Sequence, residues 1–150
     1  MQIIIGSDHA GFNLKQTILK ELKKQNIKTK DVGTFDKKSV DYPDFAEKVS
    51  KKVASNKNYK GIMLCGSGIG SCIICNKFKN IRAGICHDTY SAHQGVEHNN
   101  MNLLVMGELV IGKSLALEIL NSFIKAKFKE KKRYNKRLNK LKKIEDHNFI

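Results

Sequence analysis

The chain has 150 residues, of which 41% are hydrophobic and only one is proline, so we expect a single folded domain over residues 1–150. No run of 18 apolar residues is present, which excludes a membrane-spanning helix, and the first residues lack the basic start of a secretion signal. We therefore expect a cytoplasmic protein, and its formal net charge of +14 favours an anionic ligand or partner.

Short apolar segments alternate with amphipathic ones along the chain, which predicts β-α-β units and a parallel sheet. The five predicted strands are residues 2–6, 28–32, 61–65, 82–85 and 103–106. Apolar residues recur every four positions within 14–22 and within 45–53, which predicts a helix in each segment. Two more helices are predicted at 91–99 and 112–127.

A basic helical tail is predicted from about residue 128 to residue 150. Residues 125–143 hold eleven basic side chains and one acid, while Leu138, Leu141 and Ile144 continue an apolar stripe at helical spacing. We expect this stripe to pack on a surface, which could belong to a second subunit. The basic residues suit either phosphate recognition or nucleic-acid binding. Nucleic acid is the less favoured partner, because the tail has few aromatic residues to stack on bases and contains no recognised nucleic-acid-binding motif.

Together these elements predict an α/β fold, a Rossmann-like three-layer α/β/α sandwich with a five-stranded parallel sheet and a C-terminal helical tail. Ligands of such sheets bind beyond the carboxyl ends of the strands. This rule directs attention to the loops at 7–11, 65–71, 86–90 and 106–109.

The loop at 65–71 reads Cys-Gly-Ser-Gly-Ile-Gly-Ser and joins a predicted strand to a helix. Its glycines allow successive amides to point into one concavity, which suits a phosphate or an anionic intermediate. A dinucleotide fingerprint needs glycine at position 71 and a Cys-x5-Arg phosphatase loop needs arginine there, so Ser71 excludes both. The Gly-Lys pair of a P-loop is also absent. What remains is a thiol, Cys65, beside amides that favour a thiolate acting as nucleophile or base.

The other cysteines, Cys72, Cys75 and Cys86, are expected to be ordinary buried free thiols. A structural zinc site would need a second pair of Cys or His ligands at suitable spacing, and no such pair exists in the sequence. We therefore expect no metal.

Two further polar motifs lie near strand ends. Asp8 either caps the helix that follows it or, together with His9, binds hydroxyl and phosphate groups. His98 and Asn99 either end a helix or serve in proton transfer. The remaining histidines fit no pattern and are expected at the surface: His87, His93 and His147.

Seven ordered segments closely resemble the ribose-5-phosphate isomerase B family, a sugar-phosphate isomerase family shared with the galactose-6-phosphate isomerase subunits. They are residues 6–12, 41–43, 65–70, 76–78, 81–83, 90–92 and 98–99, and they span nearly the whole chain. The resemblance implies interconversion of ribose 5-phosphate and ribulose 5-phosphate in the pentose phosphate pathway, without a metal or organic cofactor.

By this resemblance Cys65 takes the C2 proton with help from the Ser67 hydroxyl, and His98 opens the sugar ring. The implied substrate-binding residues are Asp8, His9, Tyr42, Gly66, Gly68, Ile69, Gly70, Asn99, Arg133 and Arg137. The family is built as homodimers or dimers of dimers with shared active sites, so His98 and Asn99 would come from the neighbour of the chain that supplies Cys65.

The chain departs from the family pattern at two positions. Leu109 stands where the family has a phosphate-binding arginine, and Tyr134 stands where it has a histidine. The galactose 6-phosphate branch generally lacks the loop cysteine, and another branch uses a glutamate at the position of Ser71, so Cys65 is the only evident base here. The alternative left open within this class is a six-carbon substrate such as allose 6-phosphate.

Overall fold

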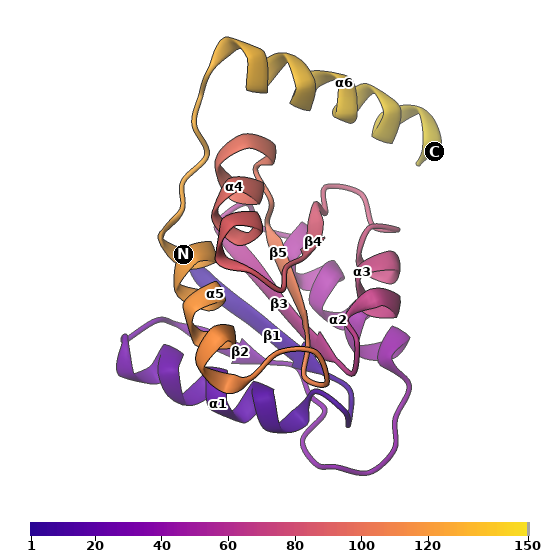
Figure 1. The fold of residues 1–150 in the computed structure, drawn as a ribbon. Coiled ribbons are helices and arrows are strands. Elements are labelled where there is room, and N and C mark those ends of the chain that lie inside the picture. The colour runs from indigo at the N-terminus through magenta and orange to yellow at the C-terminus, as the bar shows by residue number, and fades with distance from the viewer. Residues whose placement is uncertain (150) are drawn as a thin grey trace.

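The computed structural model describes residues 1–149, which contain one five-stranded sheet in the order β2-β1-β3-β5-β4 (Figure 1). All neighbouring strands pair in parallel, as the sequence predicts. The strands are β1 (Gln2–Ser7), β2 (Thr29–Asp31), β3 (Tyr59–Cys65), β4 (Ala83–Ile85) and β5 (Leu103–Gly107).

The register of the three inner strands aligns their carboxyl ends. Ser7 of β1 lies opposite Leu64 of β3, and Cys65 lies opposite Gly107 of β5. The edge strands β2 and β4 have three residues each and are shorter than predicted, whereas β1, β3 and β5 are each longer. An inner strand is hydrogen-bonded on both sides, whereas an edge strand pairs with a single neighbour.

Helices cover both faces of the sheet, which confirms the predicted three-layer α/β/α architecture. One face carries α1 (Phe12–Lys24), α4 (Thr89–Asn99) and α5 (Lys113–Lys125), and the other carries α2 (Tyr42–Ala54) and α3 (Ile69–Cys75). Alternation along β1 shows why: Ile3 and Ile5 belong to the core under the first group of helices, and Ile4 belongs to the core under the second. An inner parallel strand is buried on both faces, so its residues are apolar without alternation.

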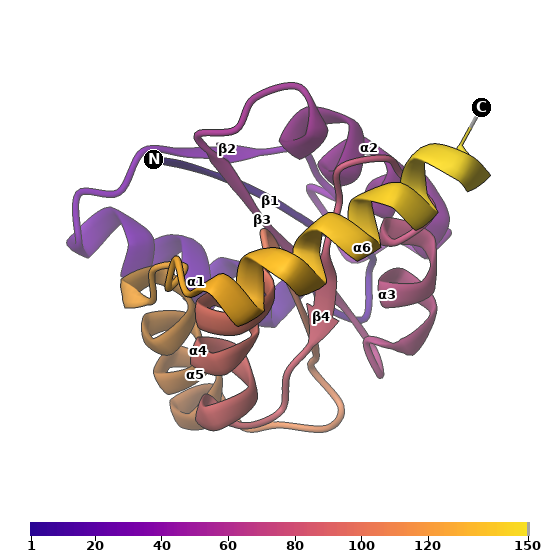
Figure 2. The ribbon, with the colours of Figure 1, turned by 90° about the horizontal axis from the view of Figure 1, so that it is seen from above.

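The last helix, α6 (Lys132–Asn148), is set apart from the two helix layers and runs across one end of the molecule, over α4 and toward α3 (Figures 1 and 2). Near its end, Glu145 accepts the Asn80 amide hydrogen and Asp146 pairs with Lys79. Its one buried residue is Tyr134 in the first turn, whereas Leu141 and Ile144 are 41% and 63% exposed. The tail is therefore helical as predicted, but its apolar stripe is largely unpacked within one chain. Residue 150, the predicted end of the tail, lies outside the described residues. Within residues 1–149, no helix combines the length and apolar character that crossing a membrane requires.

Candidate active site

Cys65 is the last residue of β3 and the first of the glycine-rich loop. Its side chain is nearly buried, at 4% exposed, and its Sγ accepts the amide hydrogen of Gly68 at 3.1 Å. Gly68 has φ of +87°, a conformation that side chains rarely adopt and that turns its N–H back toward the sulfur. The Ile69 amide donates to Ser67 Oγ at 3.3 Å, and Ser67 itself is exposed. The loop thus places one backbone donor, the Gly68 amide, against the thiol.

Two glycines, one in the loop after β1 and one at the end of β5, allow the glycine-rich loop to pack closely against these two segments. A β-carbon at Gly11 would lie 2.5 Å from the Leu64 carbonyl carbon, and one at Gly107 would lie 2.5 Å from the Ser67 carbonyl carbon. Both distances are far shorter than a carbon–carbon contact, so only glycine fits. The loops after β1 and β5 are therefore packed directly against the loop that holds Cys65.

Asp8 follows β1 and is 6% exposed, with Oδ1 accepting the amide hydrogen of Gly11 at 2.9 Å. It does not cap α1, contrary to one of the two sequence interpretations, because its carboxylate serves the loop before the helix. Glu108, which follows β5, accepts the Leu14 amide hydrogen in the first turn of α1 at 2.8 Å instead. Such a cap from 94 residues away has no local signature in the sequence.

His9 and Tyr42 border the same carboxyl-end region. His9 is exposed, and its Nδ1 lies 3.1 Å from the carbonyl oxygen and 3.2 Å from the amide nitrogen of Val40. Tyr42 begins α2 and is 37% exposed. Its ring lies against the glycine-rich loop, since a β-carbon at Gly70 would be 2.5 Å from Tyr42 Cζ. The structure thus brings Asp8, His9, Tyr42 and Cys65 together at the carboxyl end of the sheet.

The other predicted site residues form a second group, where the end of α4 meets the start of α6. The phenol oxygen of Tyr134 lies 2.9 Å from His98 Nε2 and accepts a hydrogen bond from Arg133 Nη2 at 2.7 Å. Asn99 is exposed next to His98, and Arg137 is exposed one turn beyond Arg133. Partial desolvation lowers the pKa of His98, and the nearby Arg133 guanidinium lowers it further.

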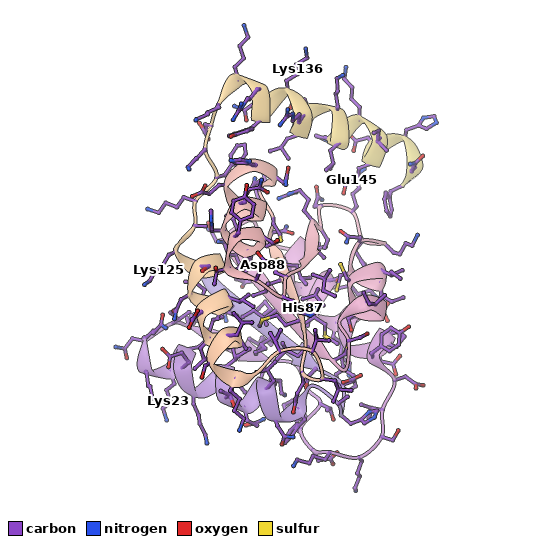
Figure 3. The ribbon with its side chains drawn as sticks, viewed as in Figure 1. Lys23, His87, Asp88, Lys125, Lys136 and Glu145 are labelled. Atoms are coloured by element: carbon purple, nitrogen blue, oxygen red, sulfur yellow. The ribbon has the colours of Figure 1, made fainter. Side chains whose placement is uncertain are left out.

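These two groups lie at opposite ends of the sheet. The helix α4 starts at Thr89, just beyond the carboxyl end of β4, and runs back for 11 residues before His98 and Asn99 close it. A helix of that length spans about 16 Å. Figure 3 marks its start at His87 and Asp88, whereas its other end lies near α6. One chain therefore does not bring His98 to Cys65.

His87 is a residue whose position the sequence analysis misjudged. It is half-buried rather than a free surface residue, and its Nε2 accepts the Gly107 amide hydrogen at 3.1 Å. Since Gly107 packs against the glycine-rich loop, His87 supports the same region from the side of β4. The partner is a backbone amide 20 residues away, so no side-chain motif could have indicated it.

The remaining thiols differ from Cys65 in their surroundings. Burial raises the pKa of Cys75 to about 11 and that of Cys86 to about 12, and it also raises the pKa of half-buried Cys72. All four cysteines are free, as predicted. Cys75 and Cys86 are buried, whereas Cys72 is only partly so.

A family model for ribose/galactose isomerases matches residues 3–141. The chain belongs to this family. Ribose-5-P isomerase B of Listeria innocua is 44% identical to it over 128 residues, which are 85% of this chain and 86% of that protein. D-erythrulose-4-phosphate isomerase of Pectobacterium atrosepticum is 39% identical over 130 residues, or 85% of each protein. The solved structure of ribose-5-phosphate isomerase B from Clostridium thermocellum has a TM-score of 0.94 and 44% identity, covering 98% of this chain and 99% of that one. As a ribose/galactose isomerase family member, the chain is an aldose–ketose isomerase.

Proposed function

We propose that this isomerase interconverts ribose 5-phosphate and ribulose 5-phosphate through an enediolate, with Cys65 as the base. The observation that carries the proposal is the thiol of Cys65 at the mouth of an amide-lined loop, with the Gly68 N–H 3.1 Å from Sγ. The thiol is thus the acid–base side chain that an amide of the loop contacts directly. The two relatives named as ribose 5-phosphate isomerases, at 44% identity, support the choice of substrate.

In this mechanism Cys65 removes the C2 proton of the open-chain aldose, assisted by the Ser67 hydroxyl, and returns a proton to C1. The proton on O2 moves to O1, so the product is the isomeric ketose and no atom is gained or lost. Negative charge develops on the enediolate oxygens, where the amides of residues 66–70 act as an oxyanion hole. Asp8 and Tyr42, beside the loop, would hold the sugar hydroxyls.

Ribose 5-phosphate is mostly a closed ring, so a second acid–base group must open it. We assign this role to His98, with Asn99 binding a sugar oxygen. The imidazole N–H gives its proton to the ring oxygen as the C1–O bond breaks, and the O1 hydroxyl proton passes to the same nitrogen in the same step, so no free imidazolate forms. Because His98 and Cys65 lie at opposite ends of one sheet, His98 must come from a second copy of the chain.

The surroundings of α6 support such a homodimer. A groove of about 490 Å³ separates this helix from the edge of the sheet, and its apolar lining includes Ile85, Met101, Leu141 and Ile144. Glu145 lies on the side of α6 that faces the groove, whereas Lys136 points away from it (Figure 3). Apolar side chains exposed on this scale favour burial against a partner.

The same arrangement would supply the phosphate site. Arg133 and Arg137 are exposed and four residues apart on α6, so both guanidinium groups can reach one phosphate. They would act together with His9 of the other subunit. Leu109, which is 82% exposed, adds no charge at this end of the site.

The decisive assay is isomerisation of ribose 5-phosphate by the pure protein and by Cys65→Ala, with Cys72→Ala as the matched control. Loss of the base should reduce kcat by roughly 1,000-fold or more. Cys72 is half-buried on α3 and has no assigned role, so its variant should keep activity. Wild-type rates in Cys65→Ala would remove this thiol from the mechanism.

The role of His98 can be separated from that of Cys65 with a substrate that has no ring. Erythrose 4-phosphate cannot form a furanose, because its O4 carries the phosphate. His98→Asn should therefore lose much more activity on ribose 5-phosphate than on erythrose 4-phosphate. Equal losses on both would refute ring opening by His98.

Shared sites can be tested by mixing the two inactive variants. After co-refolding Cys65→Ala with His98→Asn, half of the dimers would be mixed, and each would hold one intact site. We expect about a quarter of the wild-type activity on that basis. Activity that stays at the level of the separate variants would show that both residues act within one chain.

A second substrate is favoured by one specific relative. The Pectobacterium atrosepticum isomerase named for erythrulose 4-phosphate is 39% identical to this chain. Comparison of kcat/KM for four-, five- and six-carbon aldose phosphates, including allose 6-phosphate, decides the preference. We expect ribose 5-phosphate to have the highest value.

A further inference from the structure

Tyr134 joins two proposed functional groups at the base of α6. Its side chain is 2% exposed, and its ring stacks on that of His98 with the ring centres 4.3 Å apart and the planes inclined by 23°. The guanidinium carbon of Arg133 lies 4.7 Å from the Tyr134 ring centre. A tyrosine here departs from the family pattern, so the family assigns it no role.

The hydrogen-bond partners around the phenol favour one arrangement of the protons. Arginine can only donate, so the bond from Arg133 Nη2, at 2.7 Å, uses the phenol oxygen as acceptor. A buried phenol hydrogen needs an acceptor, and His98 Nε2 lies 2.9 Å away. In the arrangement that satisfies this hydrogen, Nε2 accepts and the single proton of a neutral imidazole is on Nδ1.

A protonated His98 would break this arrangement. Both Nε2–H and Arg133 would then donate to the phenol oxygen, and the phenol hydrogen would lose its acceptor at a buried position. The other charged groups near the imidazole are Glu97, which opposes this effect, and Lys129 and Lys131, which add to it.

We propose that Tyr134 is a positioning residue that keeps His98 neutral and holds its proton on Nδ1, the nitrogen opposite the phenol. The inference rests on the proposed function, because it concerns the proton that His98 gives to the ring oxygen. It also links the two roles of this region, since Arg133, the proposed phosphate ligand, orients the phenol that orients His98. Tyr134 itself touches no reacting atom.

The first test uses the wild-type protein. Long-range ¹H–¹⁵N spectra of the imidazoles at pH 7.5, with His98 assigned through His98→Asn, distinguish the two neutral tautomers directly. We expect His98 to be neutral with its proton on Nδ1. A proton on Nε2, or a charged ring at this pH, would overturn the proposal whether or not any variant folds.

The second test is Tyr134→Phe, which keeps the stacked ring and removes only the hydroxyl. Without the phenol hydrogen, the neutral imidazole loses a hydrogen bond that favours it over the protonated form, so His98 should titrate at higher pH than in the wild type. The acidic limb of kcat/KM for ribose 5-phosphate should move in the same direction, and kcat/KM at pH 7.5 should fall roughly fivefold to tenfold, as expected for one lost hydrogen bond. Activity on erythrose 4-phosphate should change less.

Tyr90→Phe is the matched control. Tyr90 lies on the same helix as His98 but pairs edge-on with His93, with the ring centres 5.4 Å apart. This variant should leave the His98 titration unchanged. An unaltered His98 titration in an active Tyr134→Phe variant would refute the proposal while the proposed function stands. Absence of isomerase activity in the wild type would instead refute the proposed function, and the tautomer would still decide the role of Tyr134.

Discussion

Replacement of Lys15 by methionine tests whether a buried ion pair holds the loop that follows β2. The Lys15 side chain is 0% exposed, and its Nζ donates to both Asp31 carboxylate oxygens at 2.7 and 2.8 Å and to the Thr34 carbonyl oxygen at 2.6 Å. Methionine keeps most of the chain length and removes the charge. The Asp31 carboxylate, 23% exposed, would then keep only the Gly33 amide, at 2.9 Å.

Removing one partner of a buried pair costs about 3–5 kcal/mol. We expect about 3 kcal/mol, the lower end of that range, because Asp31 keeps some solvent contact and one donor. At 150 residues this corresponds to a Tm decrease of roughly 6–12 °C.

The assay is urea unfolding followed by circular dichroism at a fixed protein concentration, and Lys20→Met, exposed on the same helix, is the control. The control should stay within about 0.5 kcal/mol of the wild type. Lys15→Met combined with Asp31→Asn should be less destabilised than the sum of the single variants, because the orphaned charge is gone. A loss below about 1 kcal/mol in Lys15→Met, with additive effects in the double variant, would refute the reasoning.

Three further predictions concern the candidate site and the thiols. Gly107→Ala would place a β-carbon 2.5 Å from the Ser67 carbonyl carbon and displace the glycine-rich loop, so kcat/KM should fall about 100-fold, and near-normal kinetics would contradict this packing. Leu109→Arg should lower KM for ribose 5-phosphate roughly tenfold by adding a charged donor at the phosphate end, and an unchanged KM would place Leu109 outside it. Burial raises the pKa of Cys75 to about 11 and of Cys86 to about 12, so above the ordinary value of 9.0 the native state holds protons that the unfolded state has lost. The urea concentration at the unfolding midpoint should therefore decrease as the pH is raised from 9 to about 11. A midpoint that stays constant or increases over this range would contradict these shifts.

The sheet, and the location of the candidate site at its carboxyl end, could be predicted because both depend on local sequence patterns. Uninterrupted apolar residues such as Ile3 and Ile4 mark a strand buried on both faces, and helices between such strands require parallel pairing. Parallel pairing then brings the carboxyl ends together, so a sequence that places Asp8 and Cys65 after two inner strands also places them near each other.

Contacts between distant segments could not be predicted in the same way. Two hydrogen bonds illustrate this: the Leu14 amide of α1 donates to Glu108, and the Gly107 amide donates to His87. Each joins a side chain to a backbone group far away in the chain. A backbone amide has no identity in the sequence. Such partners therefore appear only when the strand register and loop paths are known.

The sequence by itself determined the fold class, the family and the chemical character of Cys65, because glycine spacing and apolar periodicity are local properties. Only the tertiary structure decided that Cys65 and His98 lie at opposite ends of the sheet, since the direction of α4 determines where its last residues lie. It also gave Tyr134, a departure from the family pattern, a definite place between Arg133 and His98. That place follows from the packing of α6 on α4, which brings together residues 36 positions apart.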